Sequence, residues 1–188
     1  MQANWRIRKR NSITSVLVLN IKNAYLTVRA APFAKICIRI KLSTELIKWF
    51  ISFISHRTIR FAFDSKISVI IEINDSIPQG SPVLLIIFLI FIQHVIGALE
   101  PKNEIIILNY VNDLAMVTES SYTRINSIRL QLALKRLVRA ADEVQIQFDA
   151  DKLKYIYFYK NRNLINIRVT LTFTTYESSK TVKIRPQK

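Results

Sequence analysis

Polar side chains stand beside apolar segments at three places in the chain. Asn20 directly follows the apolar run SVLVL (15–19), and Asn112 and Asp113 lie in a polar stretch between two apolar ones. The third place is IPQGSP (77–82), a loop with proline and glycine that opens onto a long apolar run. Such a loop lets the backbone approach a ligand closely. An Asn-Asp pair in a turn is by itself ordinary turn chemistry, so the order of the three segments carries the information.

A mixture of strands and helices must position these segments. Apolar stretches predict strands at 15–19 and 153–159, and hairpins that join 58–63 to 67–73 and 104–108 to 114–118, the second with a polar tip at 109–113. Helical spacing predicts one helix from about 43 or 44 to 54 and a long one over 122–144. Since strands and helices do not alternate strictly, the sequence favours an α+β fold with a partly antiparallel sheet and helices on one face.

Two apolar patterns are expected to supply the core. VLLIIFLIFI (83–92) is an unbroken apolar run, about half of the roughly 20 residues that a membrane-spanning helix needs. We expect a fully buried core helix there, with Pro82 in its first turn and no stable membrane association; a membrane-associated segment over 83–99 is the alternative. In the helix over 122–144, the apolar residues at helical spacing are Ile125, Ile128, Leu132, Leu134, Leu137 and Val138.

Composition narrows the possible partners. The chain has 188 residues, with 28 Lys and Arg against 13 Asp and Glu, so its net charge is +15. Such a charge attracts polyanions, with nucleic acid as the first candidate and an anionic membrane surface as the second; a solvated basic surface without a dedicated partner is the plain alternative. The length suits one domain or a piece of a larger one. Cys37 is the only cysteine, which excludes a disulfide-stapled secreted domain.

Four segments, taken in order, carry a family resemblance. LVLNIKNAYLTV (17–28), IPQGSP (77–82), NYVNDLAMV (109–117) and FDADKLKYIYF (148–158) resemble the palm of reverse transcriptases, specifically those of non-LTR (LINE-like) retrotransposons. The family pattern is a strand ending in Asp, then P-Q-G-S-P, then Y-x-D-D, then a strand preceded by D-K. The resemblance implies a palm-type antiparallel sheet with helices on one face over 1–160. It also implies an incomplete extension toward the primer grip and thumb over 161–188, with fingers and thumb largely absent.

The resemblance implies RNA-templated DNA synthesis by two-metal nucleotidyl transfer. The expected partners are an RNA template, a DNA primer and dNTP, with Mg²⁺ as cofactor and a nuclear or cytoplasmic location, mitochondria being a further possibility. Carried over by position, Asn20, Asn112 and Asp113 take the places of the metal ligands. Lys152 takes the place of a residue that neutralises pyrophosphate; a solvated surface lysine is its alternative reading.

Further site positions follow from the same resemblance. Tyr25 falls where the family has an aromatic gate that excludes a ribose 2′-hydroxyl, and its alternative is a core aromatic residue. Three consecutive residues of the Pro- and Gly-containing loop would lie next to the template and the incoming nucleotide: Gln79, Gly80 and Ser81.

The chain departs from the family pattern in one direction. Two of the three metal-ligand positions hold Asn instead of Asp, Leu26 stands where a second Asp is frequent, and Lys154 stands where Glu is frequent. Losing a unit charge beside a divalent ion costs on the order of several kcal/mol, so the sequence predicts a catalytically dead copy. A non-catalytic, basic, nucleic-acid-binding remnant of the palm is the alternative.

The departures also share a mutational direction. Asp→Asn and Glu→Lys each require one G-to-A transition, and the same transition removes glycine codons, of which only 2 remain among 188 residues. The pattern favours a degenerate fungal retrotransposon copy whose coding DNA has been hypermutated from G:C to A:T. Part of the positive charge would then result from these mutations.

Overall fold

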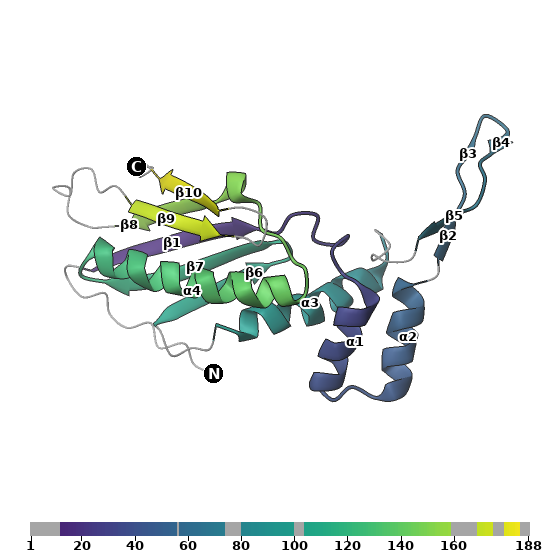
Figure 1. Ribbon diagram of the computed structural model, residues 1–188, viewed down its shortest axis with the longest axis horizontal. Helices are drawn as coiled ribbons and strands as arrows, with labels where there is room; N and C mark the ends of the chain where they lie inside the picture. The colour runs from purple at the N-terminus through teal and green to yellow at the C-terminus, as the bar shows by residue number, and fades with distance from the viewer. Residues whose placement is uncertain are drawn as a thin grey trace.

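The computed structural model describes residues 12–55, 57–73, 80–99 and 104–158, together with the backbone of 169–174 and 179–184. Its centre is a four-stranded antiparallel sheet with the strand order β6-β7-β1-β8 (Figure 1). The strands are β1 (Ile13–Asn20), β6 (Ile105–Tyr110), β7 (Asp113–Ser120) and β8 (Lys154–Phe158). The α+β class and the antiparallel sheet expected from the sequence are therefore confirmed.

Strand β1 is an inner strand of the sheet, and its residues alternate in burial. Leu17 and Leu19 are fully buried, whereas Val18 between them is partly exposed. β1 pairs with β7 over its whole length, from Ile13 opposite Ser120 to Asn20 opposite Asp113, and it pairs with β8 along its other edge. Side chains of alternate residues point to opposite faces of a sheet, so one face of this sheet is buried and the other is open.

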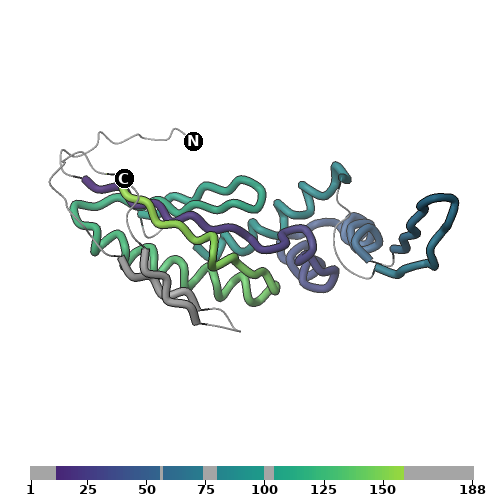
Figure 2. The backbone as a smooth tube through the Cα atoms, turned by 90° about the horizontal axis from the view of Figure 1, so that it is seen from above, coloured from purple at the N-terminus to yellow at the C-terminus, as the bar shows by residue number. Residues whose placement is uncertain are grey.

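Helix α4 (Thr123–Glu143) lies along the buried face of the sheet (Figures 1 and 2). The long helix expected over 122–144 is confirmed, but only half of its apolar residues at helical spacing are buried. Three of the six apolar residues at helical spacing are exposed, namely Ile125, Ile128 and Leu132. The buried stripe instead combines leucine and valine with small residues, which allow close packing: Leu130, Ala133, Leu134, Leu137, Val138, Ala140 and Ala141.

A buried polar cluster joins α4 to β1 and β8. The Asn126 Nδ2 donates to the carbonyl oxygen of Ile13 at 2.8 Å and to the Ser15 Oγ at 3.0 Å. The Tyr155 hydroxyl donates to the same Ser15 Oγ at 3.0 Å. Burial raises the pKa of Tyr155, so this hydroxyl stays protonated and the cluster serves packing.

Helix α3 (Pro82–Gly97) buries one side and exposes the other, although its sequence is largely apolar on both. Its buried side is formed by Ile87, Phe88, Phe91, Ile92 and Val95. The expectation of a fully buried helix is wrong, because Leu85, Ile86 and Leu89 are each between 43% and 55% exposed. An unbroken apolar run has no polar side that could mark an exposed face in advance. Among the described residues, no helix has both the length and the hydropathy needed to cross a bilayer.

Two further helices lie between the sheet and the projecting hairpin, and the first of them packs against both α3 and the second (Figure 1). They are α1 (Ala30–Arg39) and α2 (Thr44–Ile54). The Ser43 Oγ accepts a hydrogen bond from the backbone N–H of Leu46 and so caps α2, which confirms the predicted start of this helix. Phe33 on α1 and Phe50 on α2 meet edge to face, with ring centroids 5.5 Å apart.

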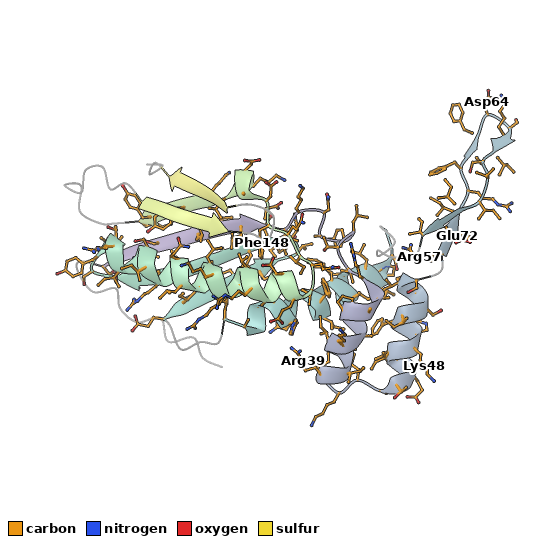
Figure 3. All side chains as sticks on the ribbon, viewed as in Figure 1. Arg39, Lys48, Arg57, Asp64, Glu72 and Phe148 are labelled. Carbon is orange, nitrogen blue, oxygen red and sulfur yellow. The ribbon has the colours of Figure 1, made fainter. Side chains whose placement is uncertain are left out.

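A hairpin follows α2 and projects from the molecule, with Asp64 at its tip (Figures 1 and 3). It consists of β2 (Arg57–Ile59), β3 (Ala62–Phe63), β4 (Lys66–Ile67) and β5 (Ile71–Ile73). Asp64 and Ser65 both have positive φ, as a two-residue type I′ turn requires. The predicted hairpin is thus confirmed. A separate two-stranded sheet contains β9 (Val169–Thr174) and β10 (Ser179–Ile184), and β9 contacts α4.

Candidate active site

The ends of β1 and β7 bring two of the predicted site residues into contact. The antiparallel register places Asn20 directly opposite Asp113, although the two are 93 positions apart in the chain. The Asn20 Nδ2 donates a hydrogen bond to the Asp113 Oδ1 at 2.8 Å. A carboxylate at position 20 would have no hydrogen to donate, so this bond depends on the amide.

The turn between β6 and β7 holds Asn112 beside the same strand end. The sequence predicted a polar tip over 109–113. The observed turn is shorter and consists only of Val111 and Asn112. Val111 has a φ of 55°, which is a strained conformation for a β-branched residue. The backbone N–H of Ile21 donates to the carbonyl oxygen of Asn112 at 2.8 Å. This bond fixes the turn against the chain as it leaves β1.

The segment before β8 crosses the end of β1 and carries Lys152 to the site. The backbone N–H of Asp149 donates to the carbonyl oxygen of Asn20 at 2.8 Å. A short 3₁₀ helix, η2 (Ala150–Lys152), follows, and the Asp149 Oδ1 caps it by accepting from the backbone N–H of Asp151. The Lys152 Nζ then lies 3.4 Å from the Asn20 Oδ1 and 3.8 Å from the Asp149 Oδ2.

Asp149 is a member of this cluster that the sequence analysis missed. Its side chain is about a quarter exposed, and it faces Lys152 across the open end of the sheet. The available signal was its position in FDADK, three residues before the lysine. With Asp113 and Asp149 negative, Lys152 positive and Asn20 neutral, the cluster is a chain of contacts from Asp113 through Asn20 and Lys152 to Asp149, with a net charge near −1.

The donor set of this cluster does not fit the pair of divalent ions that the family resemblance implies. The Asn20 amide presents its nitrogen to Asp113 and its oxygen to Lys152. Its donor therefore faces the negative side chain, and its acceptor faces the positive one. Within the described ranges, no group of three or more His, Cys, Asp or Glu side chains could hold a metal ion. Mg²⁺ prefers carboxylate oxygen, and only one of the three expected ligand positions supplies it.

The remaining predicted residues lie on the turn after β1 and at the start of α3. Tyr25 is half-buried and meets Phe88 edge to face, with ring centroids 5.4 Å apart. This contact with the core is compatible with both interpretations of Tyr25, the aromatic gate and the core aromatic residue. Leu26 is 55% exposed. Gly80 has a φ of +91°, and the Ser81 Oγ caps α3 by accepting from the N–H of Val83. Gln79 lies outside the described residues.

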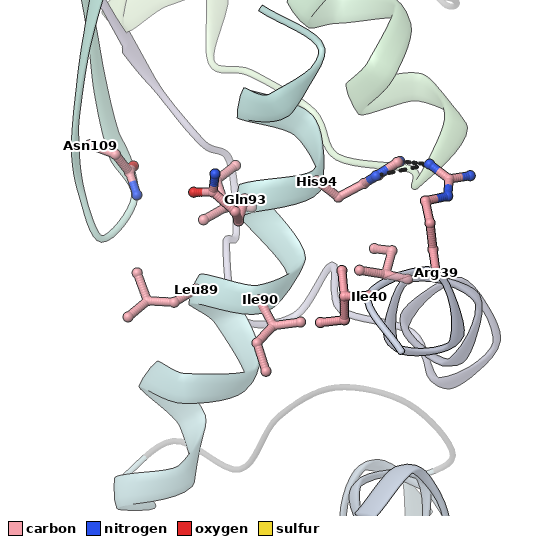
Figure 4. Close-up of a pocket in the computed structure, with 9 residues that line it drawn as sticks. Arg39, Ile40, Leu89, Ile90, Gln93, His94 and Asn109 are labelled. Atoms are coloured by element: carbon pink, nitrogen blue, oxygen red, sulfur yellow. Dashed lines mark hydrogen bonds between the residues drawn. The ribbon is translucent and has the colours of Figure 1, made fainter. Parts of the chain in front are cut away.

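A separate hollow of about 480 Å³ lies between α1, α3 and Asn109 of β6 (Figure 4). The Arg39 Nη1 lies 3.1 Å from the His94 Nδ1 at its side. Burial and the Arg39 guanidinium lower the pKa of His94, and the Glu143 carboxylate, 3.9 Å away, partly opposes them. None of the predicted site residues lines this hollow, so it is not part of the cluster at the end of β1.

Comparison with known proteins decides the family. The family model for reverse transcriptase (RNA-dependent DNA polymerase) matches residues 3–184. The chain belongs to the reverse transcriptase family. A search of curated proteins found no match.

Solved structures of telomerase resemble this chain. Apo telomerase from Candida tropicalis, truncated from its C-terminal domain, matches with a TM-score of 0.58 and 11% identity over 91% of this chain and 35% of that chain. This likeness shows that the chain has the palm fold that the sequence predicted. Telomerase from Candida albicans in complex with a fragment of telomeric RNA matches with a TM-score of 0.47 and 13% identity, over 89% of this chain and 30% of that chain. The chain spans about a third of the length of the telomerases it matches.

Proposed function

We propose that this chain is the palm segment of a reverse transcriptase from a non-LTR, LINE-like retrotransposon of fungal origin, and that this copy has lost RNA-templated DNA synthesis. The observation that carries the proposal is the hydrogen bond from Asn20 to Asp113 at the adjacent ends of β1 and β7. The bond occupies the place where the family resemblance puts two metal-binding carboxylates.

Charge explains the loss of activity. Two Mg²⁺ ions would need Asp113 and the positions of Asn20 and Asn112, but an amide offers one neutral oxygen and no charge. Each missing charge beside a divalent ion costs on the order of several kcal/mol, and each 1.4 kcal/mol or so is a factor of ten in rate. Two such losses remove essentially all of the acceleration that the metal pair would give.

The other site residues would take the roles that the family resemblance implies. Lys152, which lies beside Asn20, would neutralise a pyrophosphate leaving group. Tyr25 on the turn after β1 would exclude a ribose 2′-hydroxyl, and Gln79, Gly80 and Ser81 would contact the template and the incoming dNTP. These roles require an RNA template and a DNA primer.

Primer extension tests the proposal. The full chain is incubated with an RNA template, a DNA primer and dNTP in Mg²⁺ or Mn²⁺, beside the Asp113→Asn variant. We expect incorporation no greater than that of the variant. A matched control is Asp64→Asn, which removes a carboxylate from the tip of the exposed hairpin. Template-dependent incorporation that Asp113→Asn abolishes and Asp64→Asn leaves intact would contradict the loss of activity.

A second candidate function is non-catalytic nucleic-acid binding, and the surface of α4 favours it. Lys135, Arg136 and Arg139 are exposed on this helix, and none of them forms an ion pair with a described carboxylate. Unpaired cations close together release counterions when they meet phosphates, so the observed affinity falls with salt. A chain with a net charge of +15 suits such a role without any catalysis.

Salt dependence tests this second candidate. We expect the affinity for single-stranded RNA to fall steeply with salt, and replacement of Lys135, Arg136 and Arg139 by Gln to reduce the log–log slope by about 2. The control replaces three exposed lysines of the α1–α2 region by Gln, so that the net charge changes equally: Lys35, Lys41 and Lys48. Binding that is indifferent to salt, or equal slopes for the two triple variants, would exclude α4 as the binding surface.

A further inference from the structure

Strand β6 has an unprotected edge. In the described part of the chain it pairs only with β7, and it is the outermost strand of the sheet. The two-residue turn after Tyr110 makes Tyr110 and Asp113 a hydrogen-bonded pair, so the backbone groups of Ile105, Ile107 and Asn109 point outward from the edge. Natural sheets guard such edges with lysine, proline or a bulge, and the sequence IIILNY contains none of these.

The open face of this strand is apolar and exposed. Ile106, Leu108 and Tyr110 are 63%, 58% and 80% exposed. All three lie on the same face of the sheet because alternate residues share a face. Three large apolar side chains in a row beside an unpaired backbone edge form a surface suited to strand addition.

The other side of the same edge offers apolar side chains of α3 among polar ones. Asn109 lines the hollow beneath β6 together with Leu89 of α3 (Figure 4). Leu89 is 44% exposed, and Leu85, one helical turn earlier, is 43% exposed. A strand added along β6 would therefore meet apolar side chains of α3 on one face and those of β6 on the other.

The sequence of β6 is complementary to itself. If two copies pair antiparallel with Leu108 opposite Leu108, each Tyr110 lies opposite Ile106 of the other copy, and each Ile107 lies opposite Asn109. Every exposed apolar side chain of the strand then gains an apolar cross-strand neighbour, and aromatic with β-branched pairs are among the favourable ones. In this register the outward backbone groups of Ile107 and Asn109 face each other as a hydrogen-bonded pair.

The lack of charge on β6 allows a second copy to approach at this strand. The chain carries +15, so two copies repel each other over most of their surfaces. Strand β6 has no charged residue, so pairing of two β6 strands sets no cations of these strands against each other. An acidic partner would be attracted to the basic surfaces and would gain nothing from this neutral strand.

We propose that two copies of this chain associate through antiparallel pairing of their β6 strands, which joins the two four-stranded sheets into one continuous sheet of eight strands about a two-fold axis. The contact is isologous, as is usual for homodimers. It does not depend on catalysis, and it holds whether or not the palm binds nucleic acid.

Disulfide trapping of Leu108→Cys tests the register. Residues opposite each other in a non-hydrogen-bonded pair have Cα atoms about 4.5 Å apart, a separation that a disulfide spans. The native Cys37 is buried and its pKa is raised by burial, so it does not compete. We expect Leu108→Cys to form covalent dimers at least about tenfold faster than Phe63→Cys. The control places its cysteine at a position that is 84% exposed but lies outside the proposed contact.

A second measurement guards against chance collisions. Ile106→Cys and Tyr110→Cys should cross-link when mixed and not when each is oxidised alone, because only the mixture places two thiols opposite each other. Leu108→Lys should raise the dimer dissociation constant in analytical ultracentrifugation about tenfold or more, since like charges would face each other across the axis, and its near-ultraviolet circular dichroism should match that of the wild type. A monomeric wild type, trapping at Leu108 no faster than at Phe63, or an unchanged dissociation constant for a folded Leu108→Lys would each overturn the proposal.

Discussion

At the scale of single residues, the site is defined by amide groups where carboxylates are expected. The Asn20 amide donates to Asp113 and accepts from Lys152, so a neutral side chain satisfies both charged neighbours. Asn has nearly the same shape as Asp, and the fold therefore tolerates the exchange at the strand end. What differs is the charge. A carboxylate attracts divalent cations, whereas the Asn20 amide is neutral and forms hydrogen bonds with its two neighbours.

Asn20→Asp is expected to destabilise the chain in metal-free buffer. The new carboxylate would face Asp113 across the strand pair, and like charges directly opposite each other are unfavourable. Lys152 offsets part of the repulsion, so we expect the free energy of unfolding to fall by about 1 kcal/mol. Urea unfolding in the presence of a chelator measures it. Asn23→Asp makes the same chemical change on the exposed turn that follows and should cost much less; equal costs for both would argue against the contact.

His94 is expected to make stability sensitive to mild acid. Burial and Arg39 lower its pKa from an ordinary value near 6.5, so the unfolded chain binds the proton more readily than the folded chain does. The stability that neutral His94 provides is complete above pH 6.5 or so and is lost as the pH falls toward the depressed folded value. Replacing His94 by Gln should flatten the dependence of the unfolding free energy on pH as the pH falls below about 6.5.

A partly buried carboxyl group contributes to the pH dependence with the opposite sign. Burial raises the pKa of Asp142 from its ordinary value of 3.8, so its contribution is greatest in acid and is lost as the pH rises through its folded value. Glu143 also faces His94, from 3.9 Å. A slope that is the same for the wild type and His94→Gln would show that the acid sensitivity arises elsewhere.

The residues of the site could be predicted from the sequence to different degrees. The family resemblance predicted that Asn20 and Asp113 lie at one site, and the antiparallel register sets the end of β1 opposite the start of β7, with these two residues in contact. Asp149 could not be found in this way, since its contact arises where the segment after α4 crosses the end of β1 by backbone hydrogen bonds. A three-dimensional crossing of that kind leaves no periodic signal.

At the scale of elements, the sequence predicted which segments are helices better than which faces they bury. The apolar run 83–92 has no polar side, so only packing against α1 and α4 decides that Phe88 is buried and Leu85 is exposed. On α4 the buried stripe depends on alanines, which a search for large apolar residues passes over. α1 was not predicted, although Phe33, Ile36 and Cys37 are buried at helical spacing.

The one-sided burial of α3 has a direct consequence for stability. Phe88 is fully buried and contacts Tyr25, so Phe88→Ala should reduce the free energy of unfolding by about 3–5 kcal/mol. Leu85→Ala, one turn earlier on the exposed side, should cost less than about 1 kcal/mol. Urea unfolding of the two variants beside the wild type measures both. Similar losses would mean that α3 is buried all round, as the sequence alone suggested.

At the scale of the whole molecule, a palm sheet is combined with side chains that do not suit its usual chemistry. The four-stranded antiparallel sheet, its helix-covered face and its open face are those of the reverse transcriptase family. The family pattern survives in the register that places residues 20 and 113 together. The fold accommodates amides at these positions, because strand pairing depends on backbone bonds and buried apolar side chains. The loss of metal binding that we propose depends on a few exposed charges.

The most direct test of this account is a Mn²⁺ titration of the folded chain, followed by electron paramagnetic resonance of the unbound ion. We predict that the wild type and Asp113→Asn bind Mn²⁺ equally weakly, and that Asn20→Asp combined with Asn112→Asp tightens binding at least about tenfold by restoring two charges. A wild-type chain that binds Mn²⁺ tightly and loses it in Asp113→Asn would contradict the account, as would a double variant that gains no affinity.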